Sequence, residues 1–381
     1  MQYLKPSLQA YAWGSHSFIQ DFLKLDSPGP LAEAWYGAHP KAPAMVGNES
    51  LQMLISRQPA FWLGPKLDSF PYLLKILAAS QALSIQVHPS KTQAEQGFAR
   101  ENKLGIPLSD PTRNYQDDNH KPELFMALTD FHALCGFRTF TELVDGFESC
   151  HLGSFFAHYP AFRKNPQREN FARLYREILD PQPLPKLTEH IGKLKPQGKW
   201  EKEILWMQRL LKLYPHDKNI IAPLYLNLIE LKPYEAIFLP TGIVHAYLKG
   251  AGIEIMACSD NVLRAGLSPK HIDPAELLQT ISLEPYAPQL ITAPPIKNQM
   301  VGYLAPVKDF LLARILLEGE MELPAIAGPR ILLCLSGEAK VIHKQQELIL
   351  HSAQSIIIPH LEQKPQLAGK AEIILAAYHG N

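Results

Sequence analysis

The chain has 381 residues, of which 46% are hydrophobic and 19% are charged, so it is long enough for two or three structural units with buried cores. Lys plus Arg and Asp plus Glu both number 37, so no overall charge favours binding to nucleic acid or to an anionic membrane surface. No apolar run reaches the about 18 residues needed to cross a bilayer, and residues 1–14 lack the apolar stretch of a secretory signal. We therefore expect a cytoplasmic protein that binds its ligands at local sites.

The four cysteines, Cys135, Cys150, Cys258 and Cys334, are far apart in the sequence and have mostly apolar neighbours. The chain has no Cys-x-x-Cys pair that would indicate a thiolate metal site or a redox motif. This pattern predicts small buried thiols rather than disulfides.

Both ends of the chain have the pattern of β-strands. The 33 prolines favour short strands and tight turns over long helices, because proline fits neither helix interiors nor central strands. Short apolar or alternating runs predict strands at residues 72–79, 83–89, 330–335, 339–342, 355–359 and 371–377. Their spacing is typical of a sandwich or barrel.

The middle of the chain has a different period. Apolar residues at helical spacing predict helices at residues 170–179 and 200–213, with the proline-rich stretch 180–185 between them. A strand pattern resumes at residues 225–231. We therefore predict a helical insertion within a β protein.

A weak internal repeat supports two related β units. Residues 231–240 align without gaps with residues 350–359, and each copy is predicted to be a turn followed by an apolar strand that ends in proline. Five residues beyond that proline, the first copy has His245 and the second has Lys364. A metal ion at this place is therefore expected only in the first unit.

Several metal-binding side chains are candidates for one site. In the predicted strand 83–89, Ser84, Gln86 and His88 lie on one face, because alternate residues of a strand point the same way. Glu123 and His245 are the further candidates, and imidazole, carboxylate and amide oxygen together suit Zn²⁺ with open positions for a substrate. From the pattern alone, hydrogen-bonded histidines at strand ends and a surface carboxylate remain an alternative interpretation.

The chain resembles a known family, the class I mannose-6-phosphate isomerases, along nearly its whole length. The resemblance rests on five motifs in order: Tyr11-Ala-Trp-Gly14, Ala32-Glu-Ala-Trp-Tyr-Gly-Ala-His-Pro-Lys41, Gln86-Val-His-Pro-Ser-Lys91, Asn119-His-Lys-Pro-Glu123 and Leu239-Pro-Thr-Gly-Ile-Val-His-Ala-Tyr-Leu-Lys-Gly-Ala-Gly-Ile-Glu-Ile-Met256. It implies a mainly β fold with two cupin (jelly-roll) barrels and a helical domain. Residues 1–138 and 222–300 would form the first, metal-binding cupin domain, residues 139–221 the helical insertion, and residues 301–381 a second, metal-free cupin-like domain.

The resemblance also implies roles for individual residues. One Zn²⁺ per chain would be bound by four ligands: Gln86, His88, Glu123 and His245. The implied catalytic residues are Arg264, Glu254 and Lys121, and the implied substrate-binding residues are Ser84, Lys91, His120, Tyr247 and Asp260. Without the family, the pattern favours a salt-bridge role for Arg264, an edge charge for Glu254 and a solvated loop for His120 and Lys121. Ser90 departs from the family pattern, which commonly has asparagine there, and this departure leaves the orientation of Lys91 open.

The implied activity is an aldose-ketose isomerase reaction. It would interconvert D-mannose 6-phosphate and D-fructose 6-phosphate by zinc-assisted proton transfer through a cis-enediol, in mannose and GDP-mannose metabolism. The implied partner is a small sugar phosphate, with no nucleic acid and no membrane, and a monomer is favoured. Two other classes remain open: an Fe(II) oxygenase with a facial triad of two histidines and one glutamate, which would not need Gln86, and a sugar-binding cupin without catalysis.

Overall fold

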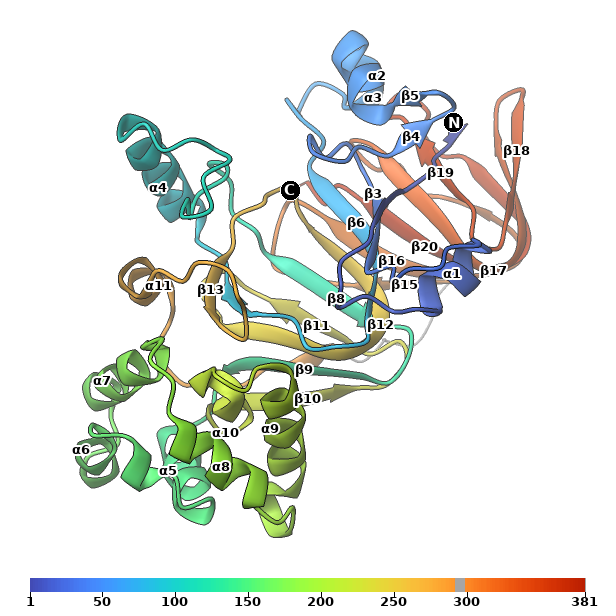
Figure 1. The fold of residues 1–381 in the computed structure, drawn as a ribbon. Helices are drawn as coiled ribbons and strands as arrows, with labels where there is room; N and C mark the ends of the chain where they lie inside the picture. Colours follow the sequence, from blue (N-terminus) through green and yellow to red (C-terminus); the bar gives the residue numbers. More distant parts are fainter. Residues whose placement is uncertain (292–298, 381) are drawn as a thin grey trace.

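The computed structural model describes residues 1–291 and 299–380, and it contains two large β-sheets and a group of helices (Figure 1). The larger sheet has eleven strands. These strands are β2 (Ser7–Gln9), β3 (Glu33–Tyr36), β6 (Tyr72–Ala79), β7 (Ile85–Val87), β8 (Glu123–Ala127), β9 (Phe131–Phe137), β10 (Leu226–Leu231), β11 (Ala236–Leu239), β12 (His245–Ala257), β13 (Leu263–Gly266) and β14 (Leu290–Ile291).

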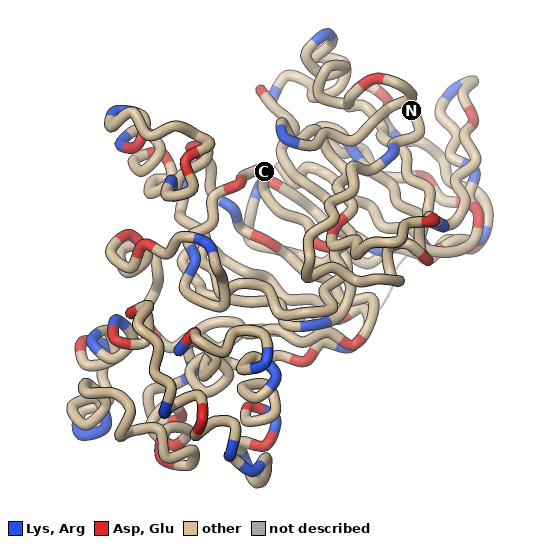
Figure 2. The backbone as a smooth tube through the Cα atoms, in the orientation of Figure 1, with Lys and Arg blue, Asp and Glu red and all other residues tan. Residues whose placement is uncertain are grey.

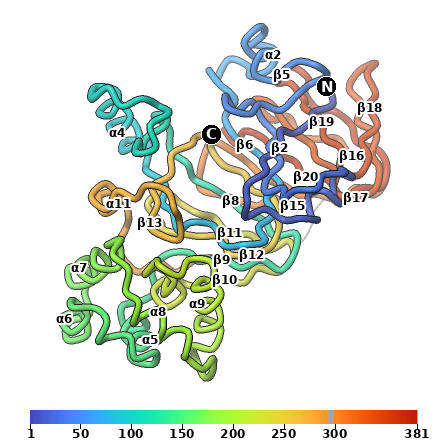
Figure 3. The backbone as a smooth tube through the Cα atoms, in the orientation of Figure 1, coloured from blue at the N-terminus to red at the C-terminus, as the bar shows by residue number. Residues whose placement is uncertain are grey.

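The second sheet has seven strands and is formed mainly by the C-terminal part of the chain. Its strands are β1 (Gln2–Tyr3), β15 (Met300–Tyr303), β16 (Leu311–Glu322), β17 (Arg330–His343), β18 (Gln346–His351), β19 (Ser355–Ile358) and β20 (Gln366–Ala377). A separate two-stranded sheet is formed by β4 (Met45–Val46) and β5 (Glu49–Ser50). The N-terminal segment contributes to both sheets (Figure 3): β1 joins the seven-stranded sheet and β2 joins the eleven-stranded sheet.

The helices fall into two sets. Those around the sheets are α1 (Phe18–Leu23), α2 (Leu51–Arg57), α3 (Pro59–Trp62), α4 (Lys91–Lys103) and α11 (Pro274–Thr280). Between β9 and β10 the chain forms helices and turns, namely α5 (Phe140–Ser149), α6 (Tyr159–Lys164), α7 (Arg168–Leu179), α8 (Pro185–Lys193), α9 (Glu201–Leu213) and α10 (Ala222–Tyr225). The stretch predicted to be a helical insertion is thus helical, and α7 and α9 lie where the sequence predicts them.

Strand β12 connects the two halves of the larger sheet. Its first part pairs with β7 and β9, and its second part pairs with β6 and β8. The pairing register shifts between Tyr247 and Lys249, where β12 changes its neighbours. A cluster that includes Leu77, Phe125 and Phe131 draws buried side chains from both halves, so the inner faces of the two halves enclose one core.

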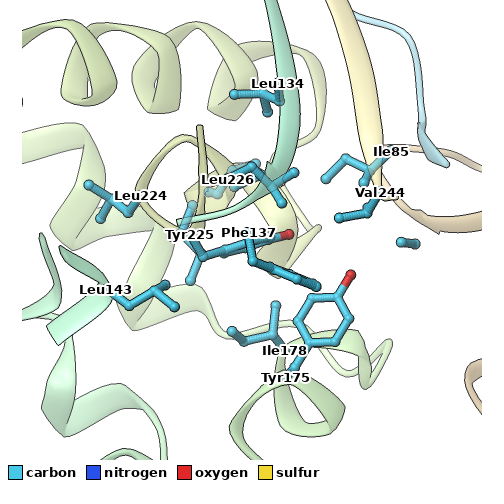
Figure 4. Packing of buried hydrophobic residues seen from close by; sticks show 14 of the residues in the cluster. Ile85, Leu134, Phe137, Leu143, Tyr175, Ile178, Leu224, Tyr225, Leu226 and Val244 are labelled. Carbon is cyan, nitrogen blue, oxygen red and sulfur yellow. The ribbon is translucent and has the colours of Figure 1, made fainter. Parts of the chain in front are cut away.

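Three further cores stack the units in layers. One includes Phe137 from β9, Tyr175 from α7 and Tyr225 from α10, and it packs the helices on the outer face of β7 and β9 (Figure 4). A second joins the outer face of β6 and β8 to one face of the seven-stranded sheet, and a third fills the other face of that sheet. The larger sheet therefore lies between the helices and the seven-stranded sheet, which fixes its inner face.

The internal repeat is visible in the backbone. Strands β11 and β19 occupy equivalent places in the alignment of the two copies. Two residues before each strand the chain has a residue with left-handed backbone, Tyr234 with φ 70° and Ala353 with φ 69°. Because residues other than glycine rarely adopt this conformation, the matching positions indicate that the same turn precedes both strands.

The two cupin barrels that the family resemblance implies are not confirmed, because neither large sheet closes on itself among the described strands. The seven-stranded sheet runs in the order β1-β19-β17-β20-β16-β15, with β18 paired to β17, and the path of the larger sheet runs from β14 to β2, so both paths end in free edges. Two predicted strands, 330–335 and 339–342, are one continuous strand, β17, because a register shift between Cys334 and Ser336 carries the pairing through the interruption. The mainly β fold with helices is confirmed. The predicted boundary near residue 300 adjoins residues 292–298, which lie outside the described residues.

The surface charges are mixed in sign. Figure 2 shows Lys and Arg interspersed with Asp and Glu over the helices and the sheet edges, and charges of both signs number 37. None of the described helices has the length and apolar character needed to cross a bilayer. All four cysteines are free thiols, as the sequence predicts, but only Cys135, Cys150 and Cys334 are buried, while Cys258 is partly exposed.

Candidate metal centre and active site

A row of three polar side chains crosses the first part of the larger sheet. Gln86 of β7 lies directly opposite His245 of β12 on one side and directly opposite Arg264 of β13 on the other. Directly opposed residues of neighbouring strands place their side chains on the same face. The sheet register therefore brings together two predicted metal ligands and the predicted catalytic arginine, which lie far apart in the sequence.

Three buried groups converge beside this row. Nε2 of His88 lies 3.3 Å from Oε1 of Glu123, and Nε2 of His245 lies 3.3 Å from Oε2 of the same carboxylate. The side chains are 1–2% exposed, and their ligand atoms all lie within 4.8 Å of one another. This geometry can hold one metal ion. The cluster of ligand atoms comprises His88, Glu123 and His245 and does not include Gln86. The role of Gln86 as a fourth ligand stays a prediction, which its place opposite His245 supports.

The other ring nitrogen of each histidine is already occupied. Nδ1 of His88 lies 2.6 Å from the carbonyl oxygen of Asn261, and Nδ1 of His245 lies 3.0 Å from the carbonyl oxygen of Ile243. Neither Nε2 atom has a hydrogen-bond partner among the described residues. A carbonyl that accepts from Nδ1–H fixes the tautomer in which Nε2 carries a lone pair, as metal-binding histidines require.

The charges in the cluster favour neutral imidazole and ionised carboxylate. Burial, with help from the positive charge of Lys121, lowers the pKa of His88 to about 4. Burial alone would raise the pKa of Glu123, but Lys121 and the histidines outweigh it and hold that pKa well below the usual range. Nζ of Lys121 lies 2.8 Å from Oε1 of Glu123. The residues present therefore fit a divalent metal ion, since neutral histidine and carboxylate are the ligand forms that bind it.

A second buried ion pair lies next to the cluster and was not predicted from the sequence. Nζ of Lys75 is 2.8 Å from Glu254 and 3.3 Å from Glu33, and all three side chains are buried. Lys75 lies opposite Glu254 in the pairing of β6 with β12. Burial would lower the pKa of Lys75, but Glu254 and Glu33 raise it above its usual value, so Lys75 stays charged.

Glu254 is held at both carboxylate oxygens. The hydroxyl of Tyr247 donates to Oε1 at 2.8 Å, and Lys75 binds Oε2. Burial raises the pKa of Glu254, while Lys75 opposes this effect. Tyr247 and Glu254 share a face because the register shift in β12 lies between them. Tyr247 is therefore both a core residue and a support for the predicted catalytic carboxylate.

A mixed set of charges lies around Asp260 and Arg264. Asp260 is paired with His39 at 3.3 Å and with Lys41 at 2.9 Å. Burial lowers the pKa of Arg264, for which no carboxylate partner is found among the described residues. The pKa of Lys270 is lowered by burial and by the nearby charges of Arg264 and Lys41. The charges of Arg264 and Lys41 thus reach Lys270.

Two predicted substrate residues have partners elsewhere in the structure. His120 contacts Asp309 at 3.1 Å. Lys91 is 46% exposed, donates to the carbonyl of Asp118 at 2.8 Å and lies 3.6 Å from Glu95.

The helix that begins at Lys91 has a capped start. Ser90 caps this helix in a reciprocal pair with Gln93, so the residue that departs from the family pattern has a structural role at the helix start. Ser84 comes directly before β7 and is partly buried.

The fold and this cluster together define a mainly β protein with a buried histidine and carboxylate centre suited to a divalent metal ion. Residues 1–140 match the family model described as phosphomannose isomerase type I, catalytic domain, and residues 300–378 match that of the mannose-6-phosphate isomerase cupin domain.

Individual relatives match along most of the chain. The mannose-6-phosphate isomerase of Escherichia coli is 36% identical over 98% of both chains, and that of Homo sapiens is 33% identical over 88% of this chain and 87% of its own.

Solved structures agree in fold. A phosphomannose isomerase variant from Salmonella typhimurium superimposes with a TM-score of 0.92 at 34% identity, covering 100% of this chain and 99% of its own. A zinc-bound mannose 6-phosphate isomerase has a TM-score of 0.90 at 35% identity, with the same coverage. The chain therefore belongs to the type I phosphomannose isomerase family, as the resemblance in sequence indicates.

The cluster predicts one tightly bound metal ion per chain. Protein stripped with a chelator and then incubated with Zn²⁺ should retain about one ion after desalting, measured by elemental analysis. Loss of a residue that only supports a ligand lowers metal affinity by about 10–100-fold. His245→Ala should lower the affinity for Zn²⁺ by far more, because it removes a ligand itself. His132→Ala is the control, since that ring packs on Trp206 outside the cluster. Two firmly held ions, or full occupancy in His245→Ala, would contradict the assignment.

Proposed function

We propose that this protein interconverts D-mannose 6-phosphate and D-fructose 6-phosphate at a single Zn²⁺ centre in the larger sheet. The observation that carries the proposal is the buried His88, Glu123 and His245 cluster next to a second buried set of acid-base groups, Lys75 and Glu254. Membership of the type I phosphomannose isomerase family supports the substrate. Gln86 is the proposed fourth ligand.

The reaction moves a proton between C1 and C2 of the open-chain sugar through a cis-enediol. Bound Zn²⁺ would supply a Lewis acid that lowers the cost of negative charge on the sugar oxygens. The chain's own residues must then hold the sugar over the centre and move the proton.

Glu254 is the proposed proton-transfer group. Its pKa is raised by burial, which brings a carboxylate closer to the range in which it can accept and return a proton near neutral pH. Tyr247 and Lys75 hold its two oxygens, so the carboxylate is oriented before the substrate binds. Lys121 is the alternative, and it lies within reach of the centre through its contact with Glu123.

Arg264 is proposed to stabilise the charge that develops on the enediolate. It lies beside Gln86 in the sheet, and among the described residues no carboxylate neutralises it. A permanently charged, planar guanidinium can donate to two sugar oxygens at once. Asp260 is proposed to contact the sugar hydroxyls, since it is held in place by His39 and Lys41.

Two places are proposed for the phosphate. The first is formed by Lys91 and Ser84, two of the substrate-binding residues that the family resemblance implies, with assistance from Arg264 or Lys121. Arg264 and Lys270 mark a second place, because burial and the charges of Arg264 and Lys41 lower the pKa of Lys270, and neighbouring cations gain stability when a dianion binds between them. We favour this second place, since Lys91 already has acidic and carbonyl partners, whereas Arg264 and Lys270 have no carboxylate partner among the described residues.

The remaining assignments are proposals from the sequence. The two large sheets are proposed to correspond to two cupin units, the first with the metal and the second without, and residues 139–221 to an inserted helical domain. A cytoplasmic, monomeric enzyme of mannose and GDP-mannose metabolism is proposed on the same basis, and His120 keeps its predicted substrate contact.

Activity is the direct test of the function. Zinc-loaded protein incubated with mannose 6-phosphate should form fructose 6-phosphate, detected by coupled conversion to glucose 6-phosphate and then NADPH. Chelator treatment should abolish the reaction and Zn²⁺ should restore it. Oxygen consumption that depends on Fe(II) would instead indicate the oxygenase alternative, and sugar-phosphate binding without turnover would indicate a binding protein.

Replacement of Arg264 should separate transition-state stabilisation from binding. Arg264→Ala is expected to lower kcat by about 100-fold or more, as loss of one preorganised donor commonly does, while KM changes less. Arg264→Lys should restore little, because an ammonium cannot reproduce the planar fork. Zinc content is the control and should stay at the wild-type level. Normal turnover in folded, zinc-loaded Arg264→Ala would show that the arginine is structural.

The phosphate position can be distinguished by two matched lysine variants. Lys270→Ala should raise KM for mannose 6-phosphate by about tenfold, the loss of roughly 1.4 kcal/mol of binding, whereas Lys91→Ala should change KM by less than about threefold. Steady-state kinetics at fixed ionic strength measures both. A larger rise in KM for Lys91→Ala would return the phosphate to the start of α4.

A further inference from the structure

Asn261 connects the metal centre to a loop that supplies other site residues. It is 0% exposed, and its carbonyl oxygen lies 2.6 Å from Nδ1 of His88, in a segment 173 residues away in the sequence. His245 differs, since its Nδ1 lies 3.0 Å from the carbonyl oxygen of Ile243, only two residues earlier in the chain. Only His88 depends on a distant part of the fold for its orientation.

The side chain of Asn261 is fully used to hold its own backbone in place. Nδ2 donates to the carbonyl oxygens of Asp117 and Asn119, both at 2.8 Å. Oδ1 accepts from the backbone amides of Gln116 at 2.7 Å and Asp117 at 3.2 Å. A buried amide that satisfies two donors and two acceptors specifies one geometry, because any shift leaves polar groups unpaired in a dry environment.

Asp117 joins the same two segments through its carboxylate. Its carboxylate accepts from the hydroxyl of Ser259 at 2.7 Å, from the amide of Asp260 at 2.7 Å and from the amide of Asn119 at 2.9 Å. Residues 116–119 lead directly to Lys121 and Glu123, and residues 259–261 lead to Arg264. The two side chains thus join the segment before the buried carboxylate to the segment before the catalytic arginine.

We propose that Asn261 is a positioning residue for the metal centre. Its side chain fixes its backbone on residues 116–119, and its carbonyl then holds His88 as the Nδ1–H tautomer with Nε2 facing Glu123 and His245. This role rests on the proposed function of the cluster as a metal centre, and Asn261 itself touches neither metal nor sugar.

The alternative is a purely structural role, in which Asn261 stabilises the loop without affecting the metal. Asn219 offers a matched comparison. It is also buried, at 3% exposed, its Nδ2 binds the carboxylate of Asp217, and its Oδ1 accepts from the hydroxyl of Tyr225. Both asparagines therefore lose buried hydrogen bonds when replaced by alanine, but Asn219 has no contact with a metal-binding side chain.

The experiment compares Asn261→Ala with Asn219→Ala in the full chain. Zn²⁺ affinity, measured by competition with a chromophoric chelator, should fall by about 10–100-fold in Asn261→Ala and by less than about threefold in Asn219→Ala. The thermal midpoints of both apo proteins should fall, because both lose buried hydrogen bonds. The visible spectrum of the Co²⁺-substituted protein should change only in Asn261→Ala. Equal Zn²⁺ affinities, or equal losses in both variants, would overturn the proposal.

A second measurement needs no variant and decides the matter if Asn261→Ala does not fold. In zinc-loaded wild-type protein, the ring nitrogens of His88 should show a protonated Nδ1 with slow exchange and a metal-bound Nε2, detected by ¹⁵N NMR. A metal-bound Nδ1 would refute the role of Asn261. Since affinity and tautomer are measured without substrate, failure of the isomerase assay alone would leave this inference standing.

Discussion

The buried carboxylate of Glu123 is the interaction on which the site depends. Moving an ionised carboxylate out of water costs several kcal/mol, so it must be paired where it lies. Lys121 supplies one positive partner at 2.8 Å, and Nε2 of His88 and of His245 lie 3.3 Å from the two carboxylate oxygens, where a bound cation would pair with all three groups. The partners come from three strands or loops that meet only in the folded sheet. Neutralising the buried charge of Glu123 thus requires the segments with Lys121, His88 and His245 to come together in one arrangement.

A rigid frame makes that geometry reproducible. Strand β12 alone supplies His245, Tyr247 and Glu254, and it pairs with four other strands along its length. The sheet is packed on its outer faces by the helices on one side and by the seven-stranded sheet on the other. Side chains on paired strands are held more precisely than side chains on loops. Loops contribute Lys121 and Asp260, and these are the ones fixed by buried hydrogen bonds around Asp117 and Asn261.

Sequence reasoning found the residues whose types stand out and missed those that need pairing information. His88, Glu123 and His245 were predicted from ligand type and motif, and the structure brings them together. Lys75 was read as part of an apolar strand, although a lysine inside such a run was itself a signal of a buried ion pair. Strict alternation along β12 places His245 and Glu254 on opposite faces. The register shift that reverses this depends on the partner strands, so one strand's sequence could not reveal it.

Two features of the fold could not be predicted from apolar patterns. The start of α4 carried a capping signal in Ser90 and Gln93, but its polar composition hid the helix from a search for apolar periodicity. Strand spacing alone indicated a sandwich or a barrel and could not decide between them, because spacing does not determine whether edge strands pair.

The balance of buried charge gives a physical reason for a metal ion at this place. Glu33, Glu123 and Glu254 contribute three negative charges, and Lys75 and Lys121 contribute two positive ones, so with neutral histidines the sum is −1. A bound divalent ion changes the sum to +1. In the proposed reaction, the proton that leaves the sugar carbon goes to Glu254, so the negative charge moves from that carboxylate to the enediolate oxygens and the sum stays at +1. A bound ion and the proposed role of Arg264 would stabilise that charge mainly after it has moved, which is the condition for raising turnover rather than affinity.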